Sequence, residues 1–231
     1  MPNPKLKDRT RWSFFFRLIK RLKESVMKMV AVGSTIEFDV LSWNQVYSML
    51  LSLADKIRMS KFKPDVIVGV SRGGWAPARV LSDFLGNPIL ANVRAEFYVG
   101  IAETEHEPAL TQPASVPVDG KKVLVVDDVA DTGKSLKLVK EYLIEQKASE
   151  VKVATVYYKP WGIVKPDYFE KETRRWVVFP WERKETVRKI IEKCRGNDVS
   201  FEKEKAKLVK AGMPAKLVNK FLKEISEEED C

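Results

Sequence analysis

Hydrophobic and polar positions divide the chain into three stretches. Between residues 34 and 183, short runs of β-branched residues alternate with segments whose apolar residues recur at helical spacing. This alternation is typical of an α/β domain in which helices flank a parallel sheet. The flanking stretches, residues 1–33 and 184–231, show helical spacing alone. We therefore predict an N-terminal amphipathic arm, a central domain and a helical C-terminal extension.

The same pattern predicts the individual elements. Ser42 and Gln45 have the spacing of a capping box and are expected to begin a helix. Residues 100–118 contain three prolines and no periodicity, which predicts a long mobile loop. Strands are expected at residues 66–70, 89–98, 123–126, 151–158 and 176–179. Further helices are expected at residues 75–85, 135–146, 185–194, 201–211 and 215–225.

Composition excludes several classes of protein. A chain of 231 residues with 45% apolar residues and two cysteines is neither disordered, nor collagen-like, nor a disulfide-stapled scaffold. No run of about 18 uncharged apolar residues is present that could span a bilayer. Cys194 and Cys231 lack the spacing of a zinc site. So few cysteines fit a reducing compartment, and we expect the protein to be cytoplasmic.

The formal net charge of +9 favours a nucleic-acid or membrane partner until it is followed along the chain. Residues 1–28 hold nine lysines and arginines against two acidic residues, whereas residues 29–183 hold twenty of each. The positive charge therefore belongs to the arm, and no nucleic-acid partner is expected for the domain. The apolar residues of the arm at helical spacing are Trp12, Phe15, Phe16, Ile19, Leu22 and Val26.

Several roles remain open for this basic arm, residues 1–33. It could lie on a membrane surface or bind an acidic partner. It could equally cap the domain or dock on a neighbouring subunit. It could also be an upstream extension, with Met27 or Met29 as the true start of the protein. Charged residues interrupt every candidate apolar core, so the arm is not a secretory signal.

The clearest chemical signal is the run VLVVDDVADTGKS, residues 123–135. An apolar strand leads to Asp127 and Asp128, and a short loop then begins a helix, an arrangement that presents backbone N–H groups to an anion. A Walker A loop would need glycine five positions before Gly133, where the chain has Asp128 instead. We therefore reject a nucleoside triphosphatase. Two carboxylates before a phosphate loop suit a ligand that carries hydroxyl groups beside its phosphate, such as a ribose 5-phosphate.

These residues resemble a known family. The run at residues 123–135 is similar to the phosphoribosyl pyrophosphate signature of type I phosphoribosyltransferases. The segment VGVSRGG, followed by Trp75, resembles the pyrophosphate loop of the same family. The segments YYKP and RRWVVFPWE resemble the purine-binding end of its xanthine-guanine and hypoxanthine members, in particular those of bacterial and archaeal type. The three matches occur in the family's order and cover residues 36–183.

The resemblance implies a role for each of these residues. Asp127 and Asp128 are implied to hold the ribose hydroxyls and to help place magnesium, and Glu182 to bind a second magnesium. Asp131 is implied to handle the proton of the purine imidazole nitrogen, which a carboxylate can do. The 5′-phosphate is implied to lie against Asp131, Thr132, Gly133, Lys134 and Ser135. Pyrophosphate is implied to lie against Ser71, Arg72, Gly73 and Gly74, where family members hold a cis peptide.

Base selection is implied to depend on three residues. An ammonium group only donates hydrogen bonds, so Lys159 pointing at purine position 6 would favour an oxo group over an amino group. Trp176 is implied to stack on the base, and Val177 to offer its backbone carbonyl. Trp161 and Trp181 are assigned to the core. The chain departs from the family before the mobile loop, where Phe97 and Tyr98 replace the usual Ser/Thr-Tyr pair.

The C-terminal extension, residues 184–231, lies outside the ordinary bacterial domain. It is expected either to pack as a cap or to gate the base site. Its expected small core comprises Leu208, Val209, Leu217, Val218, Phe221 and Leu222. Some archaeal relatives with such tails are thought to prefer adenine, and this keeps an adenine specificity open.

The sequence therefore predicts a purine phosphoribosyltransferase of purine salvage. The resemblance implies magnesium as cofactor, phosphoribosyl pyrophosphate and a purine base as substrates, and a homodimer or larger homo-oligomer. We expect a 6-oxopurine to be favoured. The alternatives are an adenine enzyme on the same scaffold and a non-catalytic regulator that senses phosphoribosyl pyrophosphate.

Overall fold

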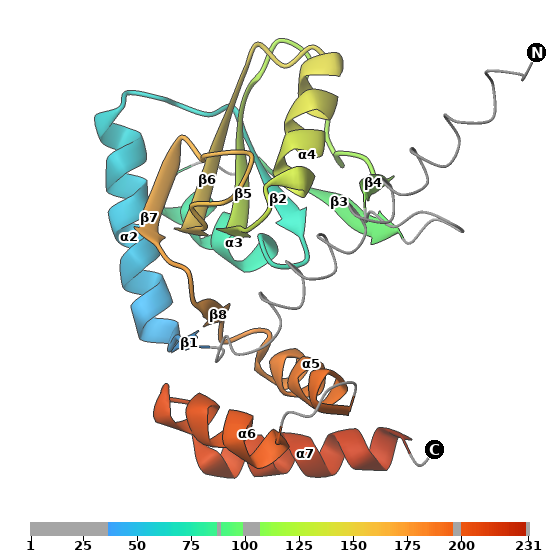
Figure 1. The fold of residues 1–231 in the computed structure, drawn as a ribbon. Coiled ribbons are helices and arrows are strands. Elements are labelled where there is room, and N and C mark those ends of the chain that lie inside the picture. The colour runs from blue at the N-terminus through green and yellow to red at the C-terminus, as the bar shows by residue number, and fades with distance from the viewer. Residues whose placement is uncertain (1–36, 87–88, 99–106, 196–199, 230–231) are drawn as a thin grey trace, which may run out of the picture. The chain divides into compact units, whose positions relative to one another are not determined.

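The computed structural model describes residues 37–86, 89–98, 107–195 and 200–229 (Figure 1). The chain divides into two compact units, Met1–Glu37 and Phe38–Cys231. The predicted basic arm lies outside the described residues, so the following account concerns the second unit. No helix among the described residues is long and apolar enough to cross a membrane. The proposed boundary between domain and extension at residue 184 stays a prediction.

A six-stranded sheet forms the centre of the second unit. Its strand order is β4-β3-β2-β5-β6-β7, and every neighbouring pair is parallel except β3 and β4. The predicted parallel sheet is therefore confirmed, with one antiparallel edge strand. The strands are β2 (Val66–Ser71), β3 (Leu90–Tyr98), β4 (Glu107–Gln112), β5 (Lys122–Ala130), β6 (Glu150–Tyr158) and β7 (Tyr168–Glu172).

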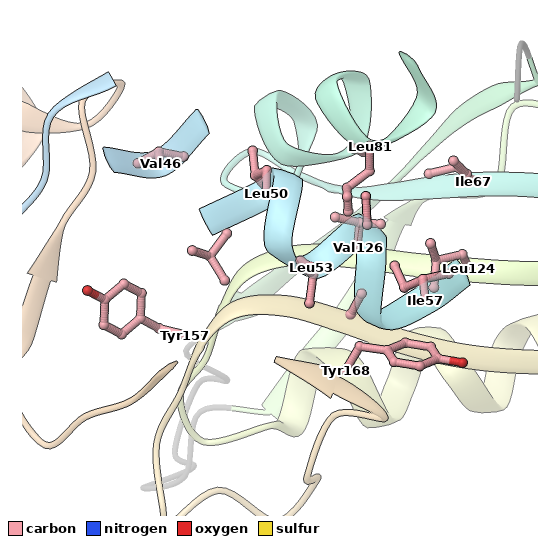
Figure 2. Close-up of a cluster of buried hydrophobic side chains, with 14 of the residues drawn as sticks. Val46, Leu50, Leu53, Ile57, Ile67, Leu81, Leu124, Val126, Tyr157 and Tyr168 are labelled. Atoms are coloured by element: carbon pink, nitrogen blue, oxygen red, sulfur yellow. The ribbon is translucent and has the colours of Figure 1, made fainter. Parts of the chain in front are cut away.

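Helices cover both faces of this sheet because its central strands are apolar on both sides. Helices α2 (Trp43–Met59) and α3 (Trp75–Phe84) pack on one face, and α4 (Lys134–Glu145) packs on the other (Figure 1). Along β5, Leu124 and Val126 belong to the core beneath α2 and α3, whereas Val123 and Val125 belong to the core beneath α4. Figure 2 shows the first of these cores.

The predicted capping box is present at the start of α2. The backbone N–H of Ser42 donates to Oε1 of Gln45 over 2.8 Å, and the backbone N–H of Gln45 donates to the Ser42 hydroxyl oxygen over 3.3 Å. The helix then buries Val46, Leu50 and Leu53 against the sheet. This local signal and the apolar spacing therefore agree on where the domain's first helix begins.

Several predicted boundaries were wrong. Residues 107–112, expected to be part of a structureless loop, form β4 against β3, while residues 99–106 lie outside the described residues. Strand β5 continues to Ala130, so Asp127 and Asp128 lie within the strand and not after it. Strand β7 and a small parallel sheet were missed. That sheet pairs β1 (Phe38–Val40) with β8 (Trp176–Val178).

The C-terminal extension contains the three expected helices. They are α5 (Arg183–Arg195), α6 (Phe201–Lys210) and α7 (Ala215–Glu229). Leu208 and Val218 are fully buried as expected, together with Met213 and Ile225. Val209, Leu217, Phe221 and Leu222 are only half-buried. The predicted small core is therefore confirmed in outline and is completed by residues on the α6–α7 turn and the last turns of α7.

Gly74, between β2 and α3, allows a close approach that no other residue permits. A Cβ atom there would lie 2.3 Å from the backbone oxygen of Val126 and 2.8 Å from that of Val70. We expect Gly74→Ala to lower the free energy of unfolding by about 3 kcal/mol, because backbone atoms would have to separate. Urea denaturation measures this effect. Gly120→Ala is the control, with a positive φ but open space, and should cost only about 1 kcal/mol. Equal losses would contradict the close approach.

Candidate active site

Three loops meet at the carboxyl ends of adjacent parallel strands. The first follows β2 and contains residues 71–74, the second follows β5 and contains residues 131–133, and the third follows β6 and begins at Lys159. Because β2, β5 and β6 are neighbours in the sheet, their loops face the same edge. Ligands of open α/β sheets bind in this position.

The loop after β5 has the geometry of a phosphate site. Gly133 adopts a φ of 77° and immediately precedes α4, and the backbone N–H of Lys134 in the first turn donates to the Thr132 hydroxyl oxygen over 3.4 Å. Its position is fixed from the other side because the N–H of Ile163 donates to the Thr132 carbonyl oxygen over 2.9 Å. Asp131 and Thr132 are exposed. The loop therefore presents backbone donors at a helix N-terminus to solvent, as an anion requires.

The acidic pair is largely withdrawn from water. Asp128 is 7% exposed, and its carboxylate accepts from the backbone N–H of Val129 at 2.8 Å and from the Trp181 indole N–H at 3.3 Å. Burial and the neighbouring charge of Asp128 raise the pKa of the Asp127 carboxyl well above its usual range. Burial also raises the pKa of Asp128, although the hydrogen bond from Trp181 opposes this. A cation at this position would relieve both penalties.

The loop after β2 lies directly against this pair. The peptide bond between Ser71 and Arg72 is cis, as the family resemblance implied. A Cβ atom on Gly73 would lie 2.2 Å from an Asp128 carboxylate oxygen, so the backbone of the loop touches the carboxylate. A cavity of about 450 Å³ opens beside this contact. It is lined by Arg72, Gly73, Trp75, Ala76, Asp128, Trp181, Glu182 and Glu185.

Glu182 lines this cavity together with Asp128 and Glu185. Burial and the charge of Asp128 raise the pKa of Glu182 to about 7. Its carboxylate accepts from the backbone N–H of Phe179 over 3.2 Å, which holds the side chain at the start of α5. The structure therefore brings Glu182 close to Asp127 and Asp128, and the loop of residues 71–74 lines the same cavity as Asp128 and Glu182.

The residues predicted to select the base lie near the third loop. Lys159 is 5% exposed, and its ammonium group donates to the backbone carbonyl of Arg175, the residue before Trp176. Burial lowers the pKa of Lys159, while the charges of Asp131 and Asp39 raise it. Trp176 is half-buried, with its ring 6.4 Å from that of Phe38. Val177 is buried in β8.

Two tryptophans assigned to the core contact site residues. Trp161 is 49% exposed, and its indole N–H donates to Asp131 over 2.9 Å. The Lys159 ammonium lies 5.3 Å from the centre of the Trp161 ring, so Trp161 contacts both Asp131 and Lys159. Trp181 stacks on Phe179 with a ring separation of 4.9 Å and reaches Asp128 at its other edge. The assignment of Trp161 to the core was wrong, and that of Trp181 was incomplete.

The sequence contained a signal for both tryptophans. Each lies directly beside a residue with a predicted role, Trp161 two positions after Lys159 and Trp181 immediately before Glu182. A tryptophan within a polar loop can use its N–H as a donor, and the position of each tryptophan beside a polar site residue is the signal for this role.

The parallel α/β sheet places the acidic pair of β5 between two glycine-containing loops, an arrangement that suits the binding of a sugar phosphate. The chain belongs to the phosphoribosyl transferase domain family, whose profile matches residues 39–186. A xanthine-guanine phosphoribosyltransferase from Gluconobacter oxydans is 32% identical over 151 residues, which cover 64% of this chain and 86% of that protein. The same enzyme from Ruegeria is 32% identical over 170 residues, which cover 68% and 91%.

Solved structures agree with these relatives. A purine phosphoribosyltransferase from Pyrococcus horikoshii has 42% sequence identity and a TM-score of 0.57, covering 62% of this chain and 93% of that one. A xanthine-guanine-hypoxanthine phosphoribosyltransferase from Helicobacter pylori, with 24% identity and a TM-score of 0.56, shares the fold and covers 66% of this chain and 98% of that one. The identification as a type I purine phosphoribosyltransferase, a pentosyltransferase, is confirmed.

The raised pKa of Glu182 predicts how stability depends on pH. The pKa of Glu182 is about 7 in the folded protein and about 4.5 in the unfolded chain. Its favourable contribution to the free energy of unfolding is therefore complete below pH 4.5, and it is lost as pH rises through 7 and the buried carboxyl group ionises. We expect Glu182→Gln, which keeps an oxygen for the Phe179 N–H, to be more stable than wild type at pH 8 by on the order of 2 kcal/mol, and to lose this advantage near pH 5. Denaturation in EDTA measures the difference.

Glu185 provides the opposite control for this prediction. The hydrogen bond from Lys189 lowers its pKa, so its stabilising effect is present above the unfolded pKa and is lost in acid. Glu185→Gln should therefore lose stability relative to wild type as pH rises from 4 to 8. The electrostatic description of the cavity would be contradicted by parallel pH profiles for the two variants.

Proposed function

We propose that the chain transfers the phosphoribosyl group of phosphoribosyl pyrophosphate to a 6-oxopurine, releasing a nucleoside 5′-monophosphate and pyrophosphate. The observation that carries this proposal is the order of contacts along one sheet edge. The half-buried Asp127 and the buried Asp128 lie against the Arg72 loop on one side, and their strand continues into the loop of Asp131 on the other. This order matches a ligand with hydroxyl groups between two phosphate-bearing ends.

The transferred sugar would be held by residues with distinct chemistry. Asp127 and Asp128 accept hydrogen bonds from ribose hydroxyls. The first-turn N–H groups of α4, with the side chains of Thr132 and Ser135, donate to the 5′-phosphate. Arg72 supplies a positive charge to the leaving pyrophosphate, and the glycines beside it permit close backbone approach.

The purine would bind between Lys159 and Trp176. Lys159 has three N–H donors, of which one is used by the Arg175 carbonyl, and it can direct another at a 6-oxo oxygen. The half-buried Trp176 offers a ring for stacking, and Val177 a backbone carbonyl. Asp131, oriented by the Trp161 N–H, accepts the proton of the attacking imidazole nitrogen. The names of the relatives favour this specificity over adenine and over a non-catalytic sensor.

Magnesium is the cofactor that the family resemblance implies, and the donors present suit it. Asp127, Asp128 and Glu182 all offer hard oxygen ligands, and the raised pKa of each reflects carboxyl groups buried near one another. The described residues contain no group of three or more acidic, histidine or cysteine side chains arranged to enclose an ion. Magnesium is usually held by one or two carboxylates together with substrate phosphates and water. Bound in this way, it would neutralise charge on the leaving pyrophosphate as the bond between ribose C1 and the pyrophosphate oxygen breaks and the bond to the purine nitrogen forms.

Two further features belong to the same proposal. A homodimer or larger homo-oligomer and a cytoplasmic location are expected for such an enzyme of purine salvage.

Asp131→Asn tests the proton-transfer role. An amide cannot accept the proton of the imidazole nitrogen, so we expect turnover with hypoxanthine to fall by on the order of 10²-fold while binding of phosphoribosyl pyrophosphate is retained. Steady-state kinetics and calorimetry measure the two quantities. Because the amide oxygen can still accept from the Trp161 N–H, the loop should keep its shape. Unchanged turnover would show that Asp131 is a loop residue without a chemical role.

Specificity is tested with adenine, hypoxanthine, guanine and xanthine as acceptors for phosphoribosyl pyrophosphate. Wild type should favour 6-oxopurines, and Lys159→Gln should reduce the discrimination between hypoxanthine and adenine by roughly 1–3 kcal/mol, because its amide can donate or accept. A preference for adenine that survives the substitution would refute the role of Lys159 and leave the phosphoribosyl transfer standing. Absence of product with every base would refute the proposed function itself.

A further inference from the structure

Glu185, in the first turn of α5, forms an ion pair with Arg72. The guanidinium nitrogen Nη2 of Arg72 lies 2.5 Å from Oε2 of Glu185, although 75% of the Arg72 side chain is exposed. The other carboxylate oxygen, Oε1, lies 2.9 Å from the Lys189 ammonium one turn later. Glu185 therefore bridges the pyrophosphate loop and α5, and it keeps a cationic partner when Arg72 leaves.

The carboxylate of Glu185 occupies the position that an anion would take relative to Arg72. Both residues line the cavity of about 450 Å³ that also contains Asp128 and Glu182. Arg72 is the only cationic side chain among the residues described as lining this cavity. A phosphate group that enters the cavity must compete with Glu185 for the same guanidinium group. The N–H donors of one guanidinium group cannot bind two anions in bidentate fashion from the same side.

The C-terminal helices hold Glu185 in this place. On another side of α5, Lys184 lies 2.7 Å from Glu224 and 2.8 Å from Glu228 of α7, and Arg195 lies 2.5 Å from Glu229. These contacts secure α5 to α7, so the helix does not need Arg72 as an anchor. The pairing of Arg72 with Glu185 can therefore open without releasing the extension.

We propose that Glu185 is a positioning residue that holds Arg72 in the free enzyme and competes with pyrophosphate for it. The inference rests on the proposed function, because it takes the Arg72 loop as the pyrophosphate site. The competition weakens retention of pyrophosphate after transfer and returns Arg72 to a defined place before the next substrate binds. The residue acts through Arg72 and does not touch the reacting atoms.

Calorimetric titration of the full-length protein with pyrophosphate and magnesium tests this competition. Glu185→Gln should bind pyrophosphate about two- to fivefold more tightly than wild type, the size expected when a mostly exposed ion pair no longer has to be broken. Loss of a merely structural contact would weaken binding instead. Glu192→Gln is the matched control, since it removes the same charge from an exposed position of the same helix, and it should leave the affinity unchanged.

The same comparison in an Arg72→Ala background separates competition from a general charge effect. There, Glu185→Gln should give no tightening, because the shared partner is absent. Equal or weaker binding by Glu185→Gln alone, or the same tightening with Arg72 removed, would overturn the inference while leaving the pyrophosphate site intact. Failure of wild type to bind pyrophosphate at all would instead overturn the assignment of the Arg72 loop and the proposed function with it.

Discussion

The contact between the Arg72 loop and the carboxyl end of β5 is the constraint on which the site depends. Two glycines in succession, Gly73 and Gly74, bring the backbone of one loop against Asp128 and against the carbonyl of Val126. Any side chain at either position would push the two strand ends apart. The parallel pairing of β2 with β5 places the loop beside the acidic pair, and the glycines let it close onto that pair.

The closeness of the carboxyl groups in this region causes electrostatic repulsion, which the other groups of the site reduce only in part. Three carboxyl groups with raised pKa values share a small, partly buried region, and the Trp181 indole supplies one neutral donor against their charge. A neutral donor stabilises a carboxylate but cannot cancel a cluster of them. Cationic charge would therefore stabilise this cluster, and a ligand that brings magnesium with its phosphates would relieve the repulsion between the carboxylates.

The parts of this arrangement that the sequence predicted are those determined locally. The capping box of Ser42, the apolar run of β5 and the glycine turn before α4 each depend on neighbouring residues, and all are present, although β5 extends beyond the expected residues. The short strands β1 and β8 could not be predicted as partners, because three residues carry little periodicity and 135 residues separate Val40 from Trp176. The sequence also could not predict the contacts of Trp161 and Trp181 or the ion pair between Glu185 and Arg72. In each case only the tertiary fold brings the residue to its partner.

The C-terminal extension contacts the candidate active site through the ion pair between Glu185 and Arg72. The sequence left open whether it caps the domain or gates the base site. In the structure α6 packs on β1, and Glu185 of α5 forms an ion pair with Arg72 of the loop after β2. Charged residues along α5 divide between two tasks: Lys184 and Arg195 bind α7, while Glu185 reaches the loop. Because burial of α6 and α7 residues stabilises the position of α5, packing far from the reacting atoms controls the availability of Arg72. An extension that packs as a cap can therefore also tune the release of an anionic product.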